Sequence, residues 1–407
     1  MITEDKVPSS FKEYCSLIME QNIDYIALSE NGNKKFTDED YPGAILDYTQ
    51  AIALNSNDAE LYYNRGNAKY NLNDFFGAIA DYNVALEIDS GYDMVYNNRG
   101  NAKNALNDYR GAIADYSAAI TADTEDATAL YNRGFAKNSI EDFRGAVIDF
   151  TAAIAIDPMH IEAYYNRGVS NFFLRNYKSA ITDYSKVISL EPYDSMAFCS
   201  RGLARKGLDD FDGSIRDFTM AIDLNGEDVV SYYNRALAKN ALFDYRGAID
   251  DFSMVLVLSP KYTLIYNLRG HAKGNLQDYA GAIADYTKVI EAEPNDVLAW
   301  YSRGFAKNAI QDFRGAVADY TKVIELNSTY PSIYTHRGNA KCNLKLYGGA
   351  VADFTSAIQL NPDDAESIYA RGLTRLDLGQ QHEAALDFQR AAELGSADAI
   401  EAIAKYC

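Results

Sequence analysis

Aspartate recurs every 34 residues along this chain, so carboxylates are the first groups whose spacing could do chemistry. Paired carboxylates act as general acids and bases in many enzymes. Arginine recurs with the same period, however, and each of these aspartates has an arginine in register with it. We therefore predict a ladder of structural ion pairs and no catalytic site. The ladder comprises Arg65 and Asp81, Arg99 and Asp115, Arg133 and Asp149, Arg167 and Asp183, Arg201 and Asp217, and Arg235 and Asp251.

No other set of residues has the spacing of a catalytic or metal site. The histidines are scattered, and neither His-Glu-x-x-His nor a Cys/His ligand pattern occurs. A phosphate-binding loop of the Gly-x-x-x-x-Gly-Lys-Ser/Thr type is also missing from the sequence. The cysteines are far apart, which favours reduced thiols. The residues thus predict a protein that is not an enzyme and that uses neither a metal nor a cofactor.

The net charge of −20 narrows the choice of partner. It opposes binding to nucleic acid phosphates and to anionic membrane surfaces, and it is compatible with a basic protein partner. No apolar run approaches the ~18 residues that a membrane span requires. Residues 1–6 lack the basic and apolar regions of a secretory signal. We expect a cytoplasmic protein that binds neither nucleic acid nor membrane.

The ladder belongs to a 34-residue repeat without insertions or deletions. One unit runs from Ala59 to Tyr92, and its residues define positions 1 to 34 of the repeat. Positions 4, 7, 8 and 11 share one face of a first helix, and positions 17, 20, 24 and 27 share one face of a second. Asp at position 16 is expected to cap the second helix, and Pro at position 32 of several units is expected to end it. A fixed period of this length predicts stacked helix hairpins, which is an all-α solenoid.

Four columns of the repeat resemble the tetratricopeptide repeat family. Position 8 is Gly in ten units, position 20 is Ala in ten, position 24 is aromatic in all eleven, and position 27 is always Ala or Val. The resemblance covers residues 25–398 in eleven units. It implies antiparallel helix hairpins stacked into a right-handed superhelical α-solenoid, with the first helices lining a concave surface.

The two chain ends align with half repeats. Residues 1–24 are predicted to be an N-terminal segment with a capping helix at about residues 10–22, which matches the second helix of a unit. Residues 399–407 are predicted to be a C-terminal capping helix, which matches a first helix.

Two columns depart from the family pattern, with Arg at position 7 and Lys or Arg at position 11 in ten units each. Position 23 is Asp in every unit and lies level with position 7 of its own hairpin and of the following one. Each aspartate is therefore expected between two arginines, in a continuous ladder of alternating charge. Position 11 faces Gly at position 19 in nine units, which would let its long stems pass towards solvent.

The opposite face of the first helix, at positions 2, 5, 6, 9, 12 and 13, is the predicted binding surface. Asn recurs there at position 6, and a carboxamide can bond the main chain of an extended peptide. This column resembles the asparagine ladder of O-linked N-acetylglucosamine transferase. Aromatic residues beside it favour contacts with partner side chains. The predicted peptide-binding residues are Asn64, Asn98, Asn132, Asn166 and Asn234, together with Phe135, Tyr165, Phe172 and Tyr233.

Other interpretations of this face stay open. The asparagines could be hydrophilic residues left by recent duplication of one unit, and the tyrosines at position 5 could pack only on the neighbouring repeat. For the whole chain we predict a non-catalytic protein–protein interaction scaffold that binds an extended or helical peptide segment in its concave groove. It would be a monomer or associate weakly with itself. A structural, self-assembling repeat protein is the alternative, and a regulatory subunit of an enzyme complex is a further one.

Overall fold

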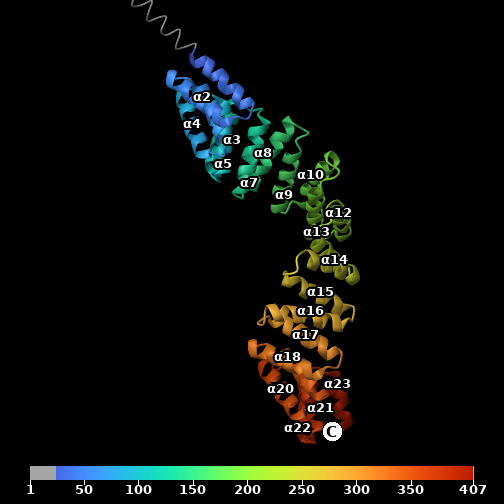
Figure 1. Ribbon diagram of the computed structural model, residues 1–407. Coiled ribbons are helices and arrows are strands. Elements are labelled where there is room, and N and C mark those ends of the chain that lie inside the picture. The colour runs from blue at the N-terminus through green and yellow to red at the C-terminus, as the bar shows by residue number, and fades with distance from the viewer. Residues whose placement is uncertain (1–23, 407) are drawn as a thin grey trace, which may run out of the picture. The chain divides into compact units, whose positions relative to one another are not determined.

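A computed structural model describes residues 24–406, and this part of the chain consists of consecutive α-helices with no strand (Figure 1). Residues 24–37 form the first of these helices. The all-α prediction is confirmed, and each repeat contributes a hairpin of two helices. The capping helix predicted at residues 10–22 lies outside the described residues.

The helices alternate between the two kinds that the repeat predicts. The first helices are α3 (Ala59–Asn71), α5 (Asp93–Ala105), α7 (Ala127–Ser139), α9 (Ile161–Phe173), α11 (Ser195–Lys206), α13 (Val229–Ala241), α15 (Thr263–Asn275), α17 (Val297–Ala309), α19 (Pro331–Asn343) and α21 (Ala365–Asp377). The second helices are α2 (Tyr41–Leu54), α4 (Phe75–Ile88), α6 (Tyr109–Ala122), α8 (Phe143–Ile156), α10 (Tyr177–Leu190), α12 (Phe211–Leu224), α14 (Tyr245–Leu258), α16 (Tyr279–Ala292), α18 (Phe313–Leu326), α20 (Tyr347–Leu360) and α22 (Gln381–Glu393). The last described helix is α23 (Ala397–Tyr406).

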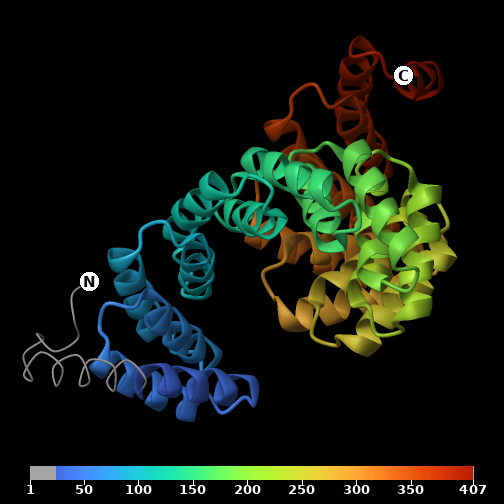
Figure 2. The ribbon, with the colours of Figure 1, turned by 90° about the horizontal axis from the view of Figure 1, so that it is seen from above.

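The chain divides into two compact units, Met1–Leu208 and Asp209–Cys407. In each unit the two helices of one repeat pack together, and the second helix then packs against the first helix of the next repeat. In the first unit, for example, α3 packs against α4 and α4 against α5, while α3 also touches α5 (Figure 2). Every helix thus contacts close neighbours in sequence, as expected for a solenoid.

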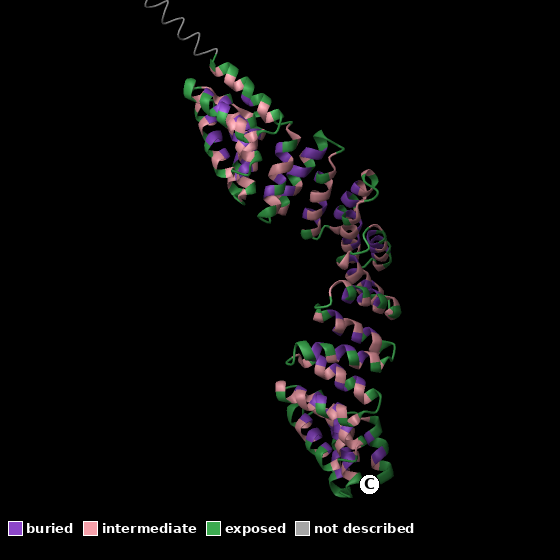
Figure 3. Cartoon of the chain, in the orientation of Figure 1, coloured by how far each residue is buried: buried purple, intermediate pink, exposed green. Residues whose placement is uncertain are grey.

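The core of a hairpin is an aromatic ring at position 24 that lies against position 8, which is glycine in all repeats but the one with Ala236. In the second repeat the Tyr82 ring is 1% exposed, and a Cβ built on Gly66 would lie 2.6 Å from it. Ala78 and Ala85, one turn away on the same helix, are completely buried. Figure 3 shows that buried positions recur along the helices of both units. The small residues let the helices approach and the ring fills the space beside the contact. Burying each such ring contributes roughly 1.5–3 kcal/mol.

The turn between the two helices has a residue in the left-handed region at position 15. Asn73 has a φ of 62° and Gln311 a φ of 65°, a conformation that favours glycine. The next residue caps the second helix, since Asp74 Oδ1 accepts a hydrogen bond of 2.9 Å from the N–H of Gly77. The predicted cap is therefore confirmed. The same bond to the residue three positions on is made by Asp40, Asp108, Asp142, Asp210, Asp244, Asp278 and Asp312.

Candidate protein-interaction surface

A cluster of three charged side chains joins the two helices of a hairpin. Arg65 Nε donates to Asp81 Oδ2 at 2.9 Å, and Arg65 Nη2 donates to Asp81 Oδ1 at 2.7 Å. Lys69 Nζ lies 2.7 Å from the same Oδ2. The Asp81 carboxylate is 5% exposed, so two cations bind it in surroundings from which water is largely excluded. Such a bidentate pair fixes geometry as well as contributing energy.

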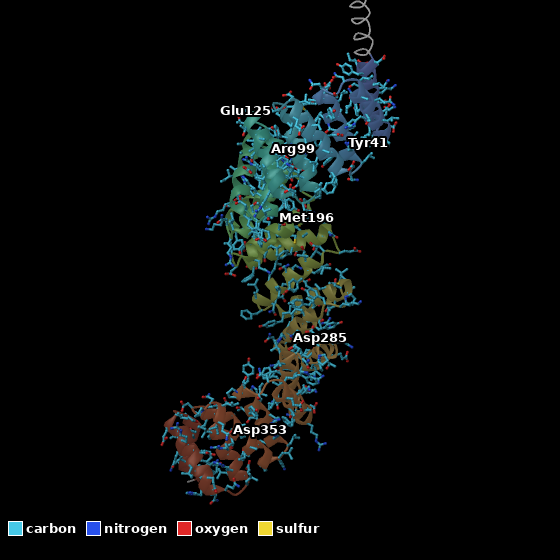
Figure 4. All side chains as sticks on the ribbon, turned by 90° about the vertical axis from the view of Figure 1, so that its left-hand side faces the viewer. Tyr41, Arg99, Glu125, Met196, Asp285 and Asp353 are labelled. Carbon is cyan, nitrogen blue, oxygen red and sulfur yellow. The ribbon has the colours of Figure 1, made fainter. Side chains whose placement is uncertain are left out.

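The bidentate contact recurs within both units, and Figure 4 labels three of the residues that make it, Arg99, Asp285 and Asp353. It joins Arg99 to Asp115, Arg133 to Asp149, Arg167 to Asp183, Arg235 to Asp251, Arg269 to Asp285, Arg303 to Asp319, Arg337 to Asp353 and Arg371 to Asp387. The remaining predicted pair, Arg201 and Asp217, is divided between the two units, since Arg201 belongs to the first and Asp217 to the second.

The expectation that each aspartate lies between two arginines is wrong. Asp81 binds Arg65 and Lys69 of its own hairpin, whereas Arg99 of the next repeat extends its Nη1 to Asn83 Oδ1 at 2.8 Å. Position 23 faces into its own hairpin, so the following arginine meets position 25 instead. The charged residues therefore form a separate cluster in each hairpin. Hydrogen bonds from arginine Nη1 to uncharged side chains connect each cluster to the preceding repeat. The acceptors for the other Nη1 atoms are Thr49, Ser117, Thr151, Ser185, Thr219, Ser253, Thr287, Thr321 and Thr355.

The arginine also lies over an aromatic ring one turn earlier in its helix. Arg65 Cζ is 5.5 Å from the centroid of the Tyr62 ring, and Arg303 Cζ is 4.7 Å from that of Trp300. A cation above an aromatic face is attracted by the ring. The sole tryptophan of the chain therefore has a packing role at position 4.

The lysines at position 11 do not extend into solvent as expected. The Lys137 stem passes over Gly145, where a Cβ would lie 3.0 Å from Lys137 Cδ, so the glycine does make room for it. Its Nζ then turns inward to Asp149 Oδ2 at 2.7 Å. The basic residues at positions 7 and 11 are thus paired with the aspartates at position 23. The rest of the surface therefore carries a larger excess of acidic residues.

The asparagine column takes part in hydrogen bonds between repeats. Asn98 Nδ2 donates to Asn67 Oδ1 at 2.9 Å and to Tyr63 Oη at 3.0 Å. The Asn67 oxygen also accepts from the Tyr82 hydroxyl at 2.7 Å. Asn64 and Asn132 make the equivalent bond to the preceding repeat, at 3.3 and 3.2 Å. The carboxamides therefore present mainly their Oδ1 atoms to a partner, because their amide hydrogens are used.

The remaining two predicted asparagines are bound differently. Asn166 Nδ2 donates to Tyr131 Oη at 3.2 Å and to the carbonyl oxygen of Glu162 at 2.9 Å. Asn234 Nδ2 donates to the carbonyl oxygen of Val230 at 2.9 Å, and this side chain is buried. Its burial makes Asn234 the least accessible member of the column.

The four aromatic residues that we predicted as contacts differ in their surroundings. Phe172 packs edge-on against Tyr177 with centroids 5.5 Å apart, and the Tyr165 hydroxyl lies 3.1 Å from Ser200 Oγ. Tyr233 packs against a tyrosine of its own repeat at 6.3 Å. Phe135 has no such partner ring and is 41% exposed. Of the four, Phe135 is the most open to another molecule.

Large apolar side chains outside the nine predicted binding residues are exposed on the first helices, at positions 2, 9 and 13 of the predicted binding surface. Helical phase identified these positions from the sequence, because they point away from the hairpin. With Phe135 they form what we call the first-helix apolar face. Its other members are Met94, Phe173 and Met196 in the first unit, and Val230, Leu264, Leu298 and Phe305 in the second, each between 47% and 64% exposed.

The second unit also contains a cavity of about 490 Å³ on this side of its first helices. His271, Tyr286 and Ser302 lie in its wall. Burial raises the pKa of Tyr286 to about 12 and lowers the pKa of His271 below its ordinary value. Both groups therefore favour their neutral forms at neutral pH.

Metal and membrane sites can be assessed for residues 24–406. Within that range no group of histidine, cysteine, aspartate and glutamate residues is placed to hold a metal ion. No helix of the described chain combines the length and apolar character needed to cross a bilayer.

Comparisons with known proteins agree with this geometry. Models described as TPR repeat match residues 32–73 and 100–138, and models described as tetratricopeptide repeat match residues 59–92, 161–194 and 264–296. A search of curated proteins found no match. The hairpins and these matches define a helical repeat protein with the fold of a protein-interaction scaffold. The matched segments are tetratricopeptide repeats, and together with the helix hairpins they support a TPR repeat protein.

Solved structures with similar folds include the C-terminal part of a TPR repeat-containing protein from Cytophaga hutchinsonii. It is 17% identical, with a TM-score of 0.53 over 59% of this chain and 98% of that one. YrrB, described as a TPR protein with an unusual peptide-binding site, is 23% identical, with a TM-score of 0.43 over 45% of this chain and 95% of its own. MamA is 27% identical, with a TM-score of 0.40 over 42% and 92%.

Proposed function

We propose that this chain is a non-catalytic scaffold that binds an extended or helical segment of another protein along its first helices. The observation that supports this most directly is the first-helix apolar face. Its members lie outside the buried columns of the repeat, which are positions 3, 8, 10, 20, 24 and 27. Exposed apolar groups of this kind are typical of protein-interaction sites.

The polar part of the proposed site is the asparagine column. Among the described residues, the Oδ1 atoms of Asn64, Asn98 and Asn132 accept no hydrogen bond, so they can accept from the main-chain N–H groups of a bound segment. Phe135 is the most exposed of the four aromatic residues predicted from the sequence, while Asn166, Asn234, Tyr165, Phe172 and Tyr233 would contribute at the border of the site.

A basic or neutral partner segment suits the charge of the scaffold. The chain has 58 acidic against 38 basic residues, and the clusters at positions 7, 11 and 23 use up many of the basic ones. The proposal further includes a cytoplasmic location, a monomeric or weakly self-associating state, and an extent of eleven repeats over residues 25–398 with a capping helix at 399–407.

Selection from a displayed library of random peptides tests the proposal without knowledge of the partner. Peptides selected on the wild-type chain should bind the Phe135→Ala/Phe173→Ala variant at least about tenfold more weakly, which corresponds to about 1.4 kcal/mol. Phe76→Ala is the matched control, because Phe76 is 76% exposed but lies on the second helix α4. Its affinity should equal that of the wild type.

Two results would count against the scaffold. One is the absence of any enriched peptide. The other is equal binding by the wild type and the double variant. Sedimentation velocity at several protein concentrations addresses the self-assembling alternative, because assembly requires the mass to rise with concentration.

A further inference from the structure

The cavity of the second unit lies between α15, α16 and α17, and it exists because position 12 of the eighth repeat has no side chain. Gly274, Tyr286 and Ser302 contribute to its wall, one from each helix. A Cβ built on Gly274 would meet no atom within 4 Å, so the space beside it is open. At about 490 Å³ the cavity is within the size range of ligand sites.

Other repeats show what belongs in this space. In the second repeat position 12 is Tyr70, whose ring packs edge-on against Phe75 at 5.3 Å and joins the cluster around Tyr82. The cavity at that place is smaller, about 280 Å³. In the fifth repeat Phe172 packs against Tyr177 at 5.5 Å in the same way. In the first repeat Phe36 packs edge-on against Tyr41 at 5.4 Å. The chain thus places its own aromatic ring at position 12 in three repeats, and Gly274 leaves the equivalent place open.

The walls of the cavity indicate a neutral aromatic occupant. Tyr279 occupies the position of Phe75 and Tyr177, so it is placed to pack edge-on against an incoming ring, and Phe305 adds a second aromatic wall. No aspartate, glutamate, lysine or arginine lines the cavity of this strongly acidic chain. The amides of its lining residues Asn275 and Gln277 can donate to and accept from a hydroxyl group.

We propose that this cavity receives a tyrosine side chain of the partner polypeptide, in the place that Tyr70 fills within the second repeat. The inference rests on the proposed function, because the ring comes from the bound segment. Its phenol ring would lie against Tyr279, and its hydroxyl would meet the amides. Binding of a single side chain is expected to be weak, with a Kd on the order of 1 mM.

The test uses N-acetyl-L-tyrosinamide as the probe and the full chain as the receptor. The chain has four histidines, so their imidazole C–H signals can be followed by NMR and assigned with a His271→Gln variant. Titration should shift the His271 signal in a saturable manner and leave that of His382, which lies on α22, unchanged. N-acetyl-L-leucinamide should bind at least about tenfold more weakly, because it lacks the ring.

A substitution that fills the cavity provides the most direct test of the proposal. Gly274→Tyr should place the chain's own ring in the cavity, as Tyr70 does, and weaken tyrosinamide binding at least about tenfold. Its melting temperature should match or exceed that of the wild type, which shows that the chain still folds. Gly348→Tyr is the matched control, since a Cβ there also meets nothing within 4 Å, and it should bind like the wild type.

The inference is overturned if tyrosinamide causes no saturable shift, if Gly274→Tyr binds it as well as the wild type, or if leucinamide binds equally well. Binding of the library-selected peptides distinguishes failure of the cavity proposal from failure of the proposed scaffold function. If Gly274→Tyr binds every selected peptide like the wild type, the cavity is not a partner site and the proposed function stands. If tyrosinamide binds but no peptide does, the proposed function fails, and so does the assignment of the bound ring to a partner polypeptide.

Discussion

At the scale of single residues, the arginine at position 7 has a partner for each part of its guanidinium group. Arg99 binds Asp115 through Nε and Nη2, reaches Asn83 through Nη1, and lies 5.5 Å from the centroid of the Tyr96 ring. A leucine could not make these contacts, so this chain uses polar bonds where the family pattern has apolar packing. Buried ion pairs add little net stability, but removing one partner leaves a charge without compensation.

Asp149→Ala should therefore lower the free energy of unfolding by about 3–5 kcal/mol. The Asp149 side chain is 1% exposed and binds both Arg133 and Lys137, which the substitution would leave facing each other. Asp363→Ala is the control, because that carboxylate is 75% exposed and its contact with Arg390 is 3.2 Å long. The control should change stability by less than ~0.5 kcal/mol. Urea denaturation followed by circular dichroism measures both, and equal midpoints would contradict the structural role of the cluster.

Three of the tyrosines at position 24 are explained by an asparagine at position 9 of the same repeat. Tyr82 donates its hydroxyl to Asn67 at position 9 of the same repeat. Position 24 is phenylalanine beside the apolar residues Phe135 and Leu237, whereas Val169 and Phe305 accompany tyrosines, so position 9 does not decide the choice in every repeat. A buried phenol requires a hydrogen-bond partner and a phenylalanine ring does not. The same pairing with asparagine recurs at Tyr48 and Tyr116.

At the scale of helices, the glycine at position 19 is explained by the cap of the second helix. In α18 a Cβ at Gly315 would collide with the carboxylate of Asp312, which caps the helix. In α20 the capping residue is Leu346, and a Cβ at Gly349 would meet nothing closer than Lys341 Cδ at 3.4 Å. The glycine is thus required by the aspartate cap, in addition to making room for the lysine stem.

Gly315→Ala and Gly349→Ala should consequently act in opposite directions. Alanine favours a helix by up to ~1 kcal/mol over glycine, so Gly349→Ala should stabilise the chain or leave it unchanged. Gly315→Ala should lose the cap and destabilise by about 0.5–2 kcal/mol. Thermal unfolding of the two variants beside the wild type checks this. A shift of the same sign and size in both would show that the cap does not explain the glycine.

At the scale of the whole molecule, stability comes from a column of similar rings and not from one central core. Each ring is buried by its own hairpin and the next helix, so the contribution repeats along each unit. Burial raises the pKa of Tyr48 and of Tyr286 to about 12, and it also raises those of Tyr116 and Tyr184. The folded chain therefore holds many phenols that resist ionisation.

Alkaline pH should accordingly unfold the protein. A phenol whose folded pKa exceeds its unfolded value of about 10 stabilises the fold below pH 10, and that contribution is lost as the pH rises towards the folded pKa. Urea midpoints should be constant between pH 8 and about pH 9.5 and fall above that. Tyr286→Phe removes one ionisable ring and should reduce the fall. If its midpoint declines as steeply as that of the wild type, buried tyrosine is not the cause.

The amino-acid sequence by itself determined the period, the two helices of each repeat, the core columns at positions 8, 20, 24 and 27, and the aspartate N-caps. These depend on contacts within a helix or across one turn, where spacing alone decides which residues meet, as at Asp74 and Gly77. Tertiary structure decided that the second cation on Asp81 is Lys69 and not Arg99, because that depends on the direction a side chain takes between packed helices. It also directed the Asn98 amide to Asn67 and left open the cavity beside Gly274, since both depend on residues about 30 positions apart that only stacking brings together.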